Sequence, residues 1–407
     1  MNFNRNFPII EVTRKAQAAL EGGHPWVYDA EVLKMTPETF ENGSLVDVVS
    51  DKGRYLGTGI FSEMSKIRVR ILSKNANDKF DDDFWRRRIK YAWDYRKCVM
   101  GSDVSACRVV FGEADHFPGL TVDLFNDVVV TQTLSIGMEK LKDRIFPLIY
   151  EQLSADGVKL RGLYERNDVA IRKLEGLEEG KGWFESIPHD GPTFTEIVEN
   201  GIIYKVDVEN GQKTGYFLDQ KYNRRAVGTL ARGKKVLDCF THTGSFALNA
   251  AISGAESVTA VDISETAIDC ARANAERNSL HNINFVCENV FDLLTELSDN
   301  GHSAYDFIIL DPPAFTKSRK TIDSAYRGYK EINYRAMKLL PRGGYLATCS
   351  CSHFMDNSKF VRMLFDAASD AKVELRQIEV RQQAPDHPIL WGVPETDYLK
   401  FYIFQVV

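Results

Sequence analysis

Residues 236–245 read Val-Leu-Asp-Cys-Phe-Thr-His-Thr-Gly-Ser, and a helical pattern over residues 246–252 follows at once. The apolar run 236–240 has the length and composition of a buried strand. Strand, short turn and helix in this order form the first unit of a doubly wound α/β sheet, in which ligands bind at the carboxyl ends of the strands. This stretch therefore predicts the fold of the surrounding domain and the location of its ligand site.

Downstream of this stretch, β runs alternate with helical patterns. The predicted strands are 236–240, 258–262, 284–287, 307–311 and 344–349, and the predicted helices are 246–252, 265–279, 326–340 and 358–371. Such alternation is typical of βαβ units, which form a parallel sheet. No helical pattern separates the last two β runs, 373–380 and 399–407, so we expect them to pair antiparallel. Residues 191–407 are thus predicted to form a Rossmann-like α/β domain with a mixed sheet.

The ends of these predicted strands carry side chains that suit a nucleoside. Asp262 can accept hydrogen bonds from both ribose hydroxyls, Asn289 can meet the adenine amino group, and Asp311 ends the fourth strand. A dinucleotide site needs G-x-G-x-x-G for its pyrophosphate, but Phe240 stands where the first glycine would be. S-adenosyl-L-methionine has no phosphate and does not need those glycines. The predicted residues of this cofactor site are Asp219, Phe240, Gly244, Ser245, Asp262, Asn289 and Asp311; the plainer alternative is a strand–turn–helix with ordinary strand-end acids.

Two further segments precede the α/β domain, as a length of 407 residues allows. Residues 1–75 combine a short helical pattern with β runs at 44–49, 55–60 and 66–72, which indicates a small β-barrel-like domain. Residues 76–190 begin with a helical pattern over 81–100. They continue with β runs at 107–111, 120–125 and 128–133 and a helix near 138–152, which indicates a central α+β domain.

Composition excludes several classes of protein. With 44% hydrophobic and 27% charged residues, the chain reads as soluble and globular, without a membrane span or a secretory signal. The seven cysteines include no C-x-x-C pair and the histidines lack metal-ligand spacing, so we expect free thiols, a cytoplasmic location and no metal. The net charge of −6 argues against a nucleic-acid partner, but residues 1–75 hold 10 basic against 9 acidic side chains, so a local basic face is compatible with it.

Five short stretches are characteristic in their order along the chain. They are Gly23-His24-Pro25-Trp26-Val27-Tyr28, Lys213-Thr214-Gly215-Tyr216-Phe217-Leu218-Asp219-Gln220, Asp311-Pro312-Pro313, Gly328-Tyr329-Lys330-Glu331-Ile332-Asn333 and Ser350-Cys351-Ser352. With them the chain resembles the large-subunit ribosomal RNA cytosine-5 methyltransferases that carry an N-terminal PUA domain. The resemblance implies a PUA RNA-binding domain at 1–75, a central domain at 76–190 and a class I methyltransferase domain at 191–407. It also implies large-subunit ribosomal RNA as partner and S-adenosyl-L-methionine as cofactor.

The chemistry of this family calls for a thiol. Cytosine C5 is a poor nucleophile, so an enzyme adds a thiolate to C6 before C5 accepts a methyl group. The resemblance implies that Cys351 is the nucleophile. The alternative, as for any lone cysteine, is a small hydrophobic residue that is buried and only packs. Asp311 is the second catalytic candidate, bonded to N3 of the flipped base. The base that removes the C5 proton is left open among His353, Asp311 and a water.

The remaining cysteines are expected to pack rather than to react. Cys349 is expected to end its strand, Cys239 to lie buried in the cofactor turn, and the other four to face helix or strand interiors: Cys98, Cys107, Cys270 and Cys287. Lys317, Arg319 and Lys320 could hold a phosphate or lie on a solvated surface.

Two other functions remain open from the sequence. One is a methyltransferase for a ring or amino nitrogen of guanine in ribosomal RNA, which would need no thiol after the fifth strand. The other is a non-catalytic RNA-binding assembly factor that kept the fold. The modified nucleotide, the maturity of the RNA substrate and the oligomeric state, a homodimer included, are not determined by the sequence.

Overall fold

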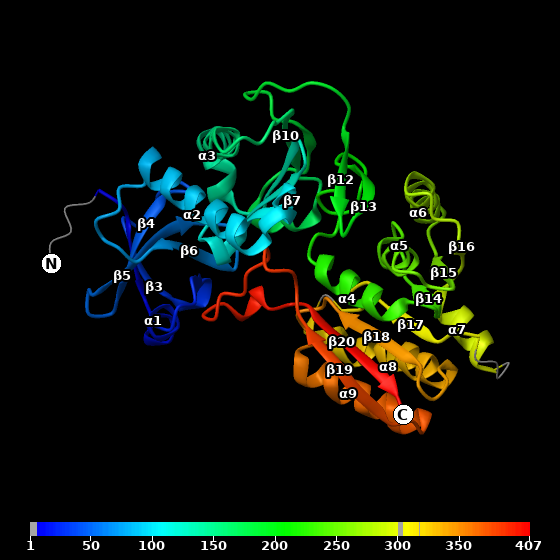
Figure 1. The fold of residues 1–407 in the computed structure, drawn as a ribbon. Coiled ribbons are helices and arrows are strands. Elements are labelled where there is room, and N and C mark those ends of the chain that lie inside the picture. Colours follow the sequence, from blue (N-terminus) through cyan, green and yellow to red (C-terminus); the bar gives the residue numbers. More distant parts are fainter. Residues whose placement is uncertain (1–5, 300–303, 317) are drawn as a thin grey trace. The chain divides into compact units, whose positions relative to one another are not determined.

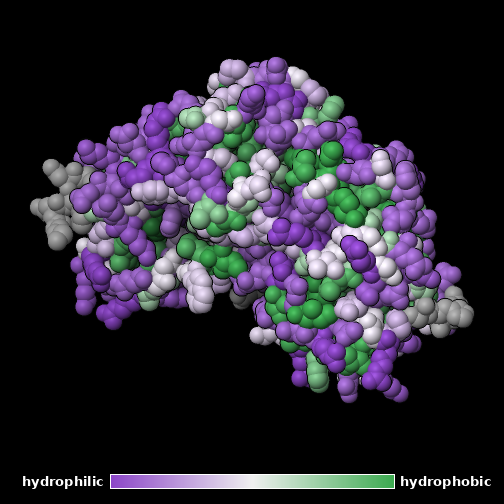
Figure 2. All heavy atoms as spheres, in the orientation of Figure 1, coloured by the Kyte–Doolittle hydropathy of each residue, from purple (hydrophilic) through white to green (hydrophobic). Residues whose placement is uncertain are grey.

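The computed structural model describes residues 6–299, 304–316 and 318–407, which form two compact units (Figure 1). One unit comprises Met1–Ile197, Lys205–Leu218 and Pro385–Thr396; the other comprises Val198–Tyr204, Asp219–Ala384 and Asp397–Val407. No helix in the described residues is both long and apolar enough to cross a membrane. On the face drawn in Figure 2, hydrophilic side chains predominate and hydrophobic ones form separate patches.

The first unit begins with a six-stranded sheet in the order β2-β6-β5-β4-β1-β3. Its elements are β1 (Ile9–Val12), α1 (Arg14–Glu21), β2 (Trp26–Tyr28), β3 (Val32–Thr36), β4 (Leu45–Ser50), β5 (Tyr55–Phe61) and β6 (Ile67–Ser73). The sheet and α1 share one apolar core that includes Val12, Leu20, Val48 and Val69. The β runs expected in residues 44–72 are confirmed, whereas β1, β2 and β3 were not expected.

A second sheet of this unit has the order β11-β10-β9-β8-β7. It comprises β7 (Ala106–Phe111), β8 (Leu120–Phe125), β9 (Val128–Thr133), β10 (Gly162–Arg166) and β11 (Lys181–Trp183), with α2 (Asp82–Met100) and α3 (Ile136–Ala155). The segment Pro385–Thr396 is bound here, because Arg96 donates to the Asp386 carbonyl (2.9 Å) and Arg108 N donates to Asp386 Oδ2 (2.8 Å). A hairpin of β12 (Phe194–Glu199) and β13 (Ile202–Asp207) follows, and its tip, Val198–Tyr204, belongs to the second unit.

The second unit contains a seven-stranded sheet in the order β16-β15-β14-β17-β18-β20-β19. Its strands are β14 (Lys235–Cys239), β15 (Ser257–Asp262), β16 (Ile283–Cys287), β17 (Phe307–Leu310), β18 (Tyr345–Ser350), β19 (Leu375–Arg381) and β20 (Lys400–Val406). The first five run parallel, and β20 pairs antiparallel with both β18 and β19. The expected Rossmann-like sheet with an antiparallel C-terminal pair is confirmed.

Helices cover both faces of this sheet and create two apolar cores. The helices are α4 (Lys221–Ala231), α5 (Ser245–Ile252), α6 (Glu265–Arg277), α7 (Val290–Asp299), α8 (Ile322–Leu339) and α9 (Asn357–Ala371). Alternate residues of one strand enter opposite cores: Leu237 of β14 packs with residues of α7, α8 and α9, whereas Val236 packs with residues of α4 and α5. The parallel strands are therefore apolar on both faces, and polar chemistry is left to their ends.

Candidate active site

The turn after β14 departs from ordinary backbone geometry at three positions. Phe240 has φ of +65°, His242 +51° and Gly244 +81°. Asp238, which is fully buried, holds the turn by accepting hydrogen bonds from Thr241 Oγ1 (2.6 Å) and Ala247 N (2.9 Å). Burial raises the pKa of the Asp238 carboxyl to about 7. The turn is thus fixed before any ligand binds.

Gly244 serves helix packing in this turn. A Cβ atom at its position would lie 2.7 Å from Leu248 Cδ1 and 3.0 Å from Ala271 Cβ, so a side chain would clash with α5 and α6. Ser245, 7% exposed, begins α5 and its hydroxyl lies 3.0 Å from Thr243 Oγ1. Cofactor contacts of Phe240, Gly244 and Ser245 stay predictions.

Asp262 and Asn289 lie at the carboxyl ends of the two neighbouring strands. Asp262 ends β15 and accepts from the backbone amides of His242 (3.0 Å) and Ser264 (3.0 Å), one on each carboxylate oxygen. Asn289 follows β16 and its Oδ1 accepts from Phe291 N (2.9 Å), while its Nδ2 donates to no described residue. Both side chains are partly exposed, so both can also bind a ligand.

Asp219 is 5% exposed and lies before α4. Its Oδ2 accepts a hydrogen bond from the hydroxyl of Tyr398 (2.6 Å), and its carbonyl accepts from Ala384 N (2.7 Å). The residue expected at the methionine end of the cofactor is therefore anchored to the segment that leads into β20.

Asp311, directly after β17, is held by two donors on one oxygen. Its Oδ1 accepts from the Cys349 thiol (2.8 Å) and from Gln220 Nε2 (3.2 Å), which also lies 3.4 Å from Cys349 Sγ. Among the described residues no donor reaches Asp311 Oδ2. Burial raises the pKa of Asp311, although the Cys349 hydrogen bond opposes this effect. One carboxylate oxygen is thus fixed, and the other meets no donor in the part of the chain that the structure describes.

Gln220 and Cys349 were not among the predicted site residues. Gln220 follows Asp219 in a characteristic stretch, and this position beside a predicted site residue could have indicated it. Cys349 was expected only to pack, and it is indeed fully buried in β18. Its hydrogen bond to Asp311 adds a polar role, and burial raises its pKa well above the ordinary value of a thiol.

Cys351 lies in the turn after β18, between two serines that are tied to different parts of the domain. Ser350 Oγ bonds to the Tyr329 hydroxyl on α8 (3.0 Å), and Ser352 Oγ donates to the carbonyl of Thr316 (3.0 Å). Both serines are buried, whereas Cys351 is partly exposed. The serines fix the backbone of the turn and leave the cysteine between them accessible.

The predicted residues therefore share one edge of the sheet. In the spatial order of the strands, Asn289 follows β16, Asp262 ends β15, the 240–245 turn follows β14, Asp311 follows β17 and Cys351 follows β18. Because these strands are parallel, their carboxyl ends meet at the same edge. His353 is exposed two residues beyond Cys351, and it has no recorded hydrogen bond to a described residue.

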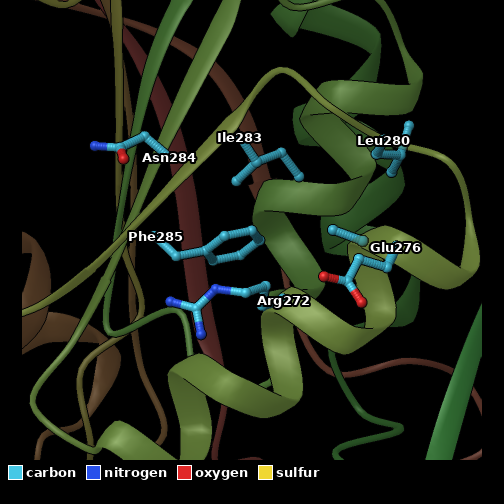
Figure 3. A pocket seen from close by; sticks show the side chains of 7 residues that line it. Arg272, Glu276, Leu280, Ile283, Asn284 and Phe285 are labelled. Carbon is cyan, nitrogen blue, oxygen red and sulfur yellow. The ribbon is translucent and has the colours of Figure 1, made fainter.

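Several other features lie away from this edge or outside the described residues. An open groove lined by Arg272, Glu276 and Phe285 lies between α6 and the amino end of β16, so it is separate from this edge (Figure 3). Lys317 and the side chain of Arg319 lie outside the described residues. The expectation that all spare cysteines pack is wrong for Cys98 and Cys287, which occupy solvent faces of α2 and β16.

Comparison with known proteins agrees with this architecture. Residues 180–399 match the model of the S-adenosylmethionine-dependent methyltransferases, and residues 10–74 match a PUA-like domain. The chain belongs to the S-adenosylmethionine-dependent methyltransferase family.

Relatives of this family extend over the full chain. Ribosomal RNA large subunit methyltransferase I of Photobacterium profundum is 38% identical over 98% of this chain and 99% of its own. The protein of the same name from Shewanella frigidimarina is 40% identical over 96% and 97%. A Streptococcus mutans structure designated a SAM-dependent methyltransferase has a TM-score of 0.81 at 24% identity, covering 98% of this chain and all of its own, which shows a shared fold.

S-adenosylmethionine is the cofactor of the family, and the residues at the edge of the sheet fit it. The turn after β14 lacks a glycine-rich phosphate loop, which a cofactor without phosphate does not need. Asp262 offers carboxylate lone pairs to ribose hydroxyls, and the second lone pair of Asn289 Oδ1 can still accept from the adenine amino group. Figure 1 shows the strands that carry these residues, β14 to β18, in green to orange. Among the described residues no group of three potential metal ligands is found.

Proposed function

We propose that this protein is a methyltransferase of large-subunit ribosomal RNA that forms 5-methylcytosine through a covalent bond between Cys351 and C6 of the base. The observation that carries the proposal is the accessible Cys351 on a fixed turn, one strand away from Asp311, whose Oδ2 accepts no hydrogen bond from a described residue. The relatives named for large-subunit ribosomal RNA support the substrate. Such a substrate accords with the expected cytoplasmic location; a homodimer stays a prediction.

The proposed residues have separate tasks. The Cys351 thiolate adds to C6, and a proton reaches N3 from Asp311, whose raised pKa favours proton donation. C5 then carries enamine character and accepts the methyl group that S-adenosylmethionine supplies. The C5 proton then passes to His353, Asp311 or a water, and N3 gives its proton back as the Cys351 thiolate leaves, which restores the aromatic ring, the Asp311 carboxyl and the free enzyme. Cys349 is unsuited to the first step, because burial raises its pKa and its thiol is bonded to Asp311.

The PUA-like domain is proposed to bind RNA. The domain boundaries after residues 75 and 190 remain part of the proposal. The target cytosine must leave its stack to reach the edge of the sheet, as in other enzymes that act on a base. RNA that presents the cytosine in a loop or single strand would lower this cost.

The test is nucleoside mass spectrometry of large-subunit RNA from cells with and without the gene. We expect one 5-methylcytidine to disappear in the deletion strain and to return with the wild-type gene but not with Cys351→Ala. Loss of a methylguanosine instead would establish the guanine alternative, and an unchanged methylation pattern would leave only the assembly-factor alternative. Either result would overturn the proposal.

A further inference from the structure

Lys400 is a buried lysine beside the turn that carries Cys351. It is the first residue of β20, where its Cα pairs with that of Ser350 in the antiparallel ladder with β18. The residue is only 6% exposed. Its Nζ donates to the carbonyl oxygens of Ser352 (2.6 Å) and Tyr398 (2.7 Å). Because lysine is rarely buried without a partner, its position calls for a specific reason.

The ammonium group lacks a carboxylate at ion-pair distance among the described residues. Burial lowers the pKa of Lys400 to about 8, and four acidic groups oppose this effect at longer range. In decreasing order of their effect, these groups are Cys351, Asp397, Cys349 and Asp356. The two carboxylates are already engaged, since Asp356 caps α9 and bonds to Lys359, and Asp397 accepts from Gln382.

Cys351 therefore lies beside this cation, because Lys400 pairs with Ser350 and bonds to the carbonyl of Ser352, the two residues that flank Cys351. The thiolate is the nucleophilic form of cysteine, and a nearby lysine favours it. In a partly buried site the attraction between opposite charges is stronger than in water. Cys349 cannot take the same part, because its thiol already donates to Asp311.

The two hydrogen bonds of Lys400 also join parts of the site. The carbonyl of Ser352 belongs to the turn of Cys351, and Tyr398 binds Asp219 through its hydroxyl (2.6 Å). One side chain thus links the turn of the candidate nucleophile to the segment that anchors a candidate cofactor residue.

We propose that Lys400 is a positioning residue that fixes the Cys351 turn and stabilises the Cys351 thiolate with its positive charge. The inference rests on the proposed role of Cys351. When the thiol ionises, its proton passes to solvent and Lys400 keeps its own proton, so the pair forms without any change in the bonds of Lys400.

The test is alkylation of Cys351 in the full-length protein, without RNA or cofactor. Iodoacetamide labelling is followed from pH 6 to 10, and peptide fragmentation separates Cys351 from Cys349. Lys400→Met removes the charge at similar length, Lys400→Arg keeps it, and Lys372→Met at the exposed end of α9 is the matched control. At pH 7 we expect labelling of Cys351 in Lys400→Met to fall about tenfold and its midpoint to rise by about one pH unit. Lys400→Arg should keep most of the rate, and Lys372→Met all of it.

Equal labelling of Cys351 in folded Lys400→Met and wild type would overturn the inference. If Lys400→Met does not fold, the wild-type protein provides the test. We expect the pH midpoint of alkylation to be lower for Cys351 than for the exposed Cys98, and an equal or higher midpoint refutes the inference. Alkylation does not depend on methyl transfer. If Lys400→Met slows labelling of Cys351 but Cys351→Ala still methylates RNA, the proposed function is rejected and this inference stands. If Cys351 forms a covalent adduct with RNA but Lys400→Met labels at the wild-type rate, this inference is rejected and the proposed function stands.

Discussion

The Cys349 thiol donates a hydrogen bond of 2.8 Å to Asp311 Oδ1 across two neighbouring parallel strands. With Gln220 on the same oxygen, the bond fixes the carboxylate, and no donor among the described residues reaches Oδ2, where we propose that the base binds. In this arrangement the two cysteines of β18 and its turn have different tasks. Cys349 orients the acid, and Cys351 is the candidate nucleophile.

Replacing Gln220 tests the orientation of Asp311. Gln220→Leu removes one of the two donors to Oδ1, and loss of such a bond costs about 1–3 kcal/mol. We expect methyl transfer to ribosomal RNA, measured at saturating cofactor, to fall about 10- to 100-fold. Gln377→Leu on the exposed face of β19 is the matched control and should keep full activity. Full activity in Gln220→Leu would mean that Asp311 needs no such support.

Two substitutions at Cys349 separate its hydrogen bond from its packing. Cys349→Ser keeps a donor to Asp311, so we expect it to retain most of the methyl-transfer activity. Cys349→Val keeps the apolar volume but loses the donor, and its activity should fall about tenfold or more. Steady-state methylation of ribosomal RNA measures both. The reverse ranking would show that packing, not the hydrogen bond, is what the site requires.

The buried Asp238 predicts a pH dependence of stability. Its pKa is raised to about 7 in the folded protein, against about 4 for an unfolded chain. Its contribution to stability is therefore complete below about pH 4 and is lost as the pH rises to about 7. Relative to Asp238→Asn, which cannot ionise, the wild type should lose about 1–3 kcal/mol between pH 5 and 7.5 in urea unfolding. A difference that stays constant with pH would contradict the raised pKa.

Exposed lysines of the PUA-like domain allow a test of its proposed RNA binding. Lys34, Lys52 and Lys66 are exposed and form no ion pair with a described residue, unlike Arg68 and Arg70, which bind Asp29 and Glu175. Reversing the three charges should weaken RNA binding and lower its salt dependence, because fewer phosphates are neutralised. Filter binding at several salt concentrations measures both, and cofactor affinity is the internal control. Unchanged RNA affinity would remove these lysines from the interface.

The sequence predicted the methyltransferase sheet well because its strands are apolar on both faces and its turns are polar. It did not predict α4, whose first half is polar apart from Tyr222 and whose aliphatic residues begin only at Ala226. That helix buries Lys221 and Arg224, and Arg224 is paired with Glu199 at 2.6 Å. A polar buried face depends on partners far along the chain, so periodicity alone cannot reveal it.

At the candidate site, the sequence indicated which residues end strands but not how they contact one another. Asp262, Asp311 and Cys351 follow from their places after β runs. The bonds from Gln220 and Cys349 to Asp311 depend on the pairing of β17 with β18 and on the path of the chain before α4. No sequence pattern indicated a role for Lys400, which lies at the start of an antiparallel strand.

Covalent trapping tests the central claim most directly. Large-subunit RNA that contains 5-fluorocytidine blocks removal of the C5 substituent, so an enzyme that attacks C6 stays bound to it. With S-adenosylmethionine present, we predict a denaturant-resistant protein–RNA complex for the wild type and for Cys349→Ser, with the link mapped to Cys351 by mass spectrometry, and none for Cys351→Ala. A wild-type protein that methylates this RNA without forming the complex, or a complex that persists in Cys351→Ala, would contradict the account.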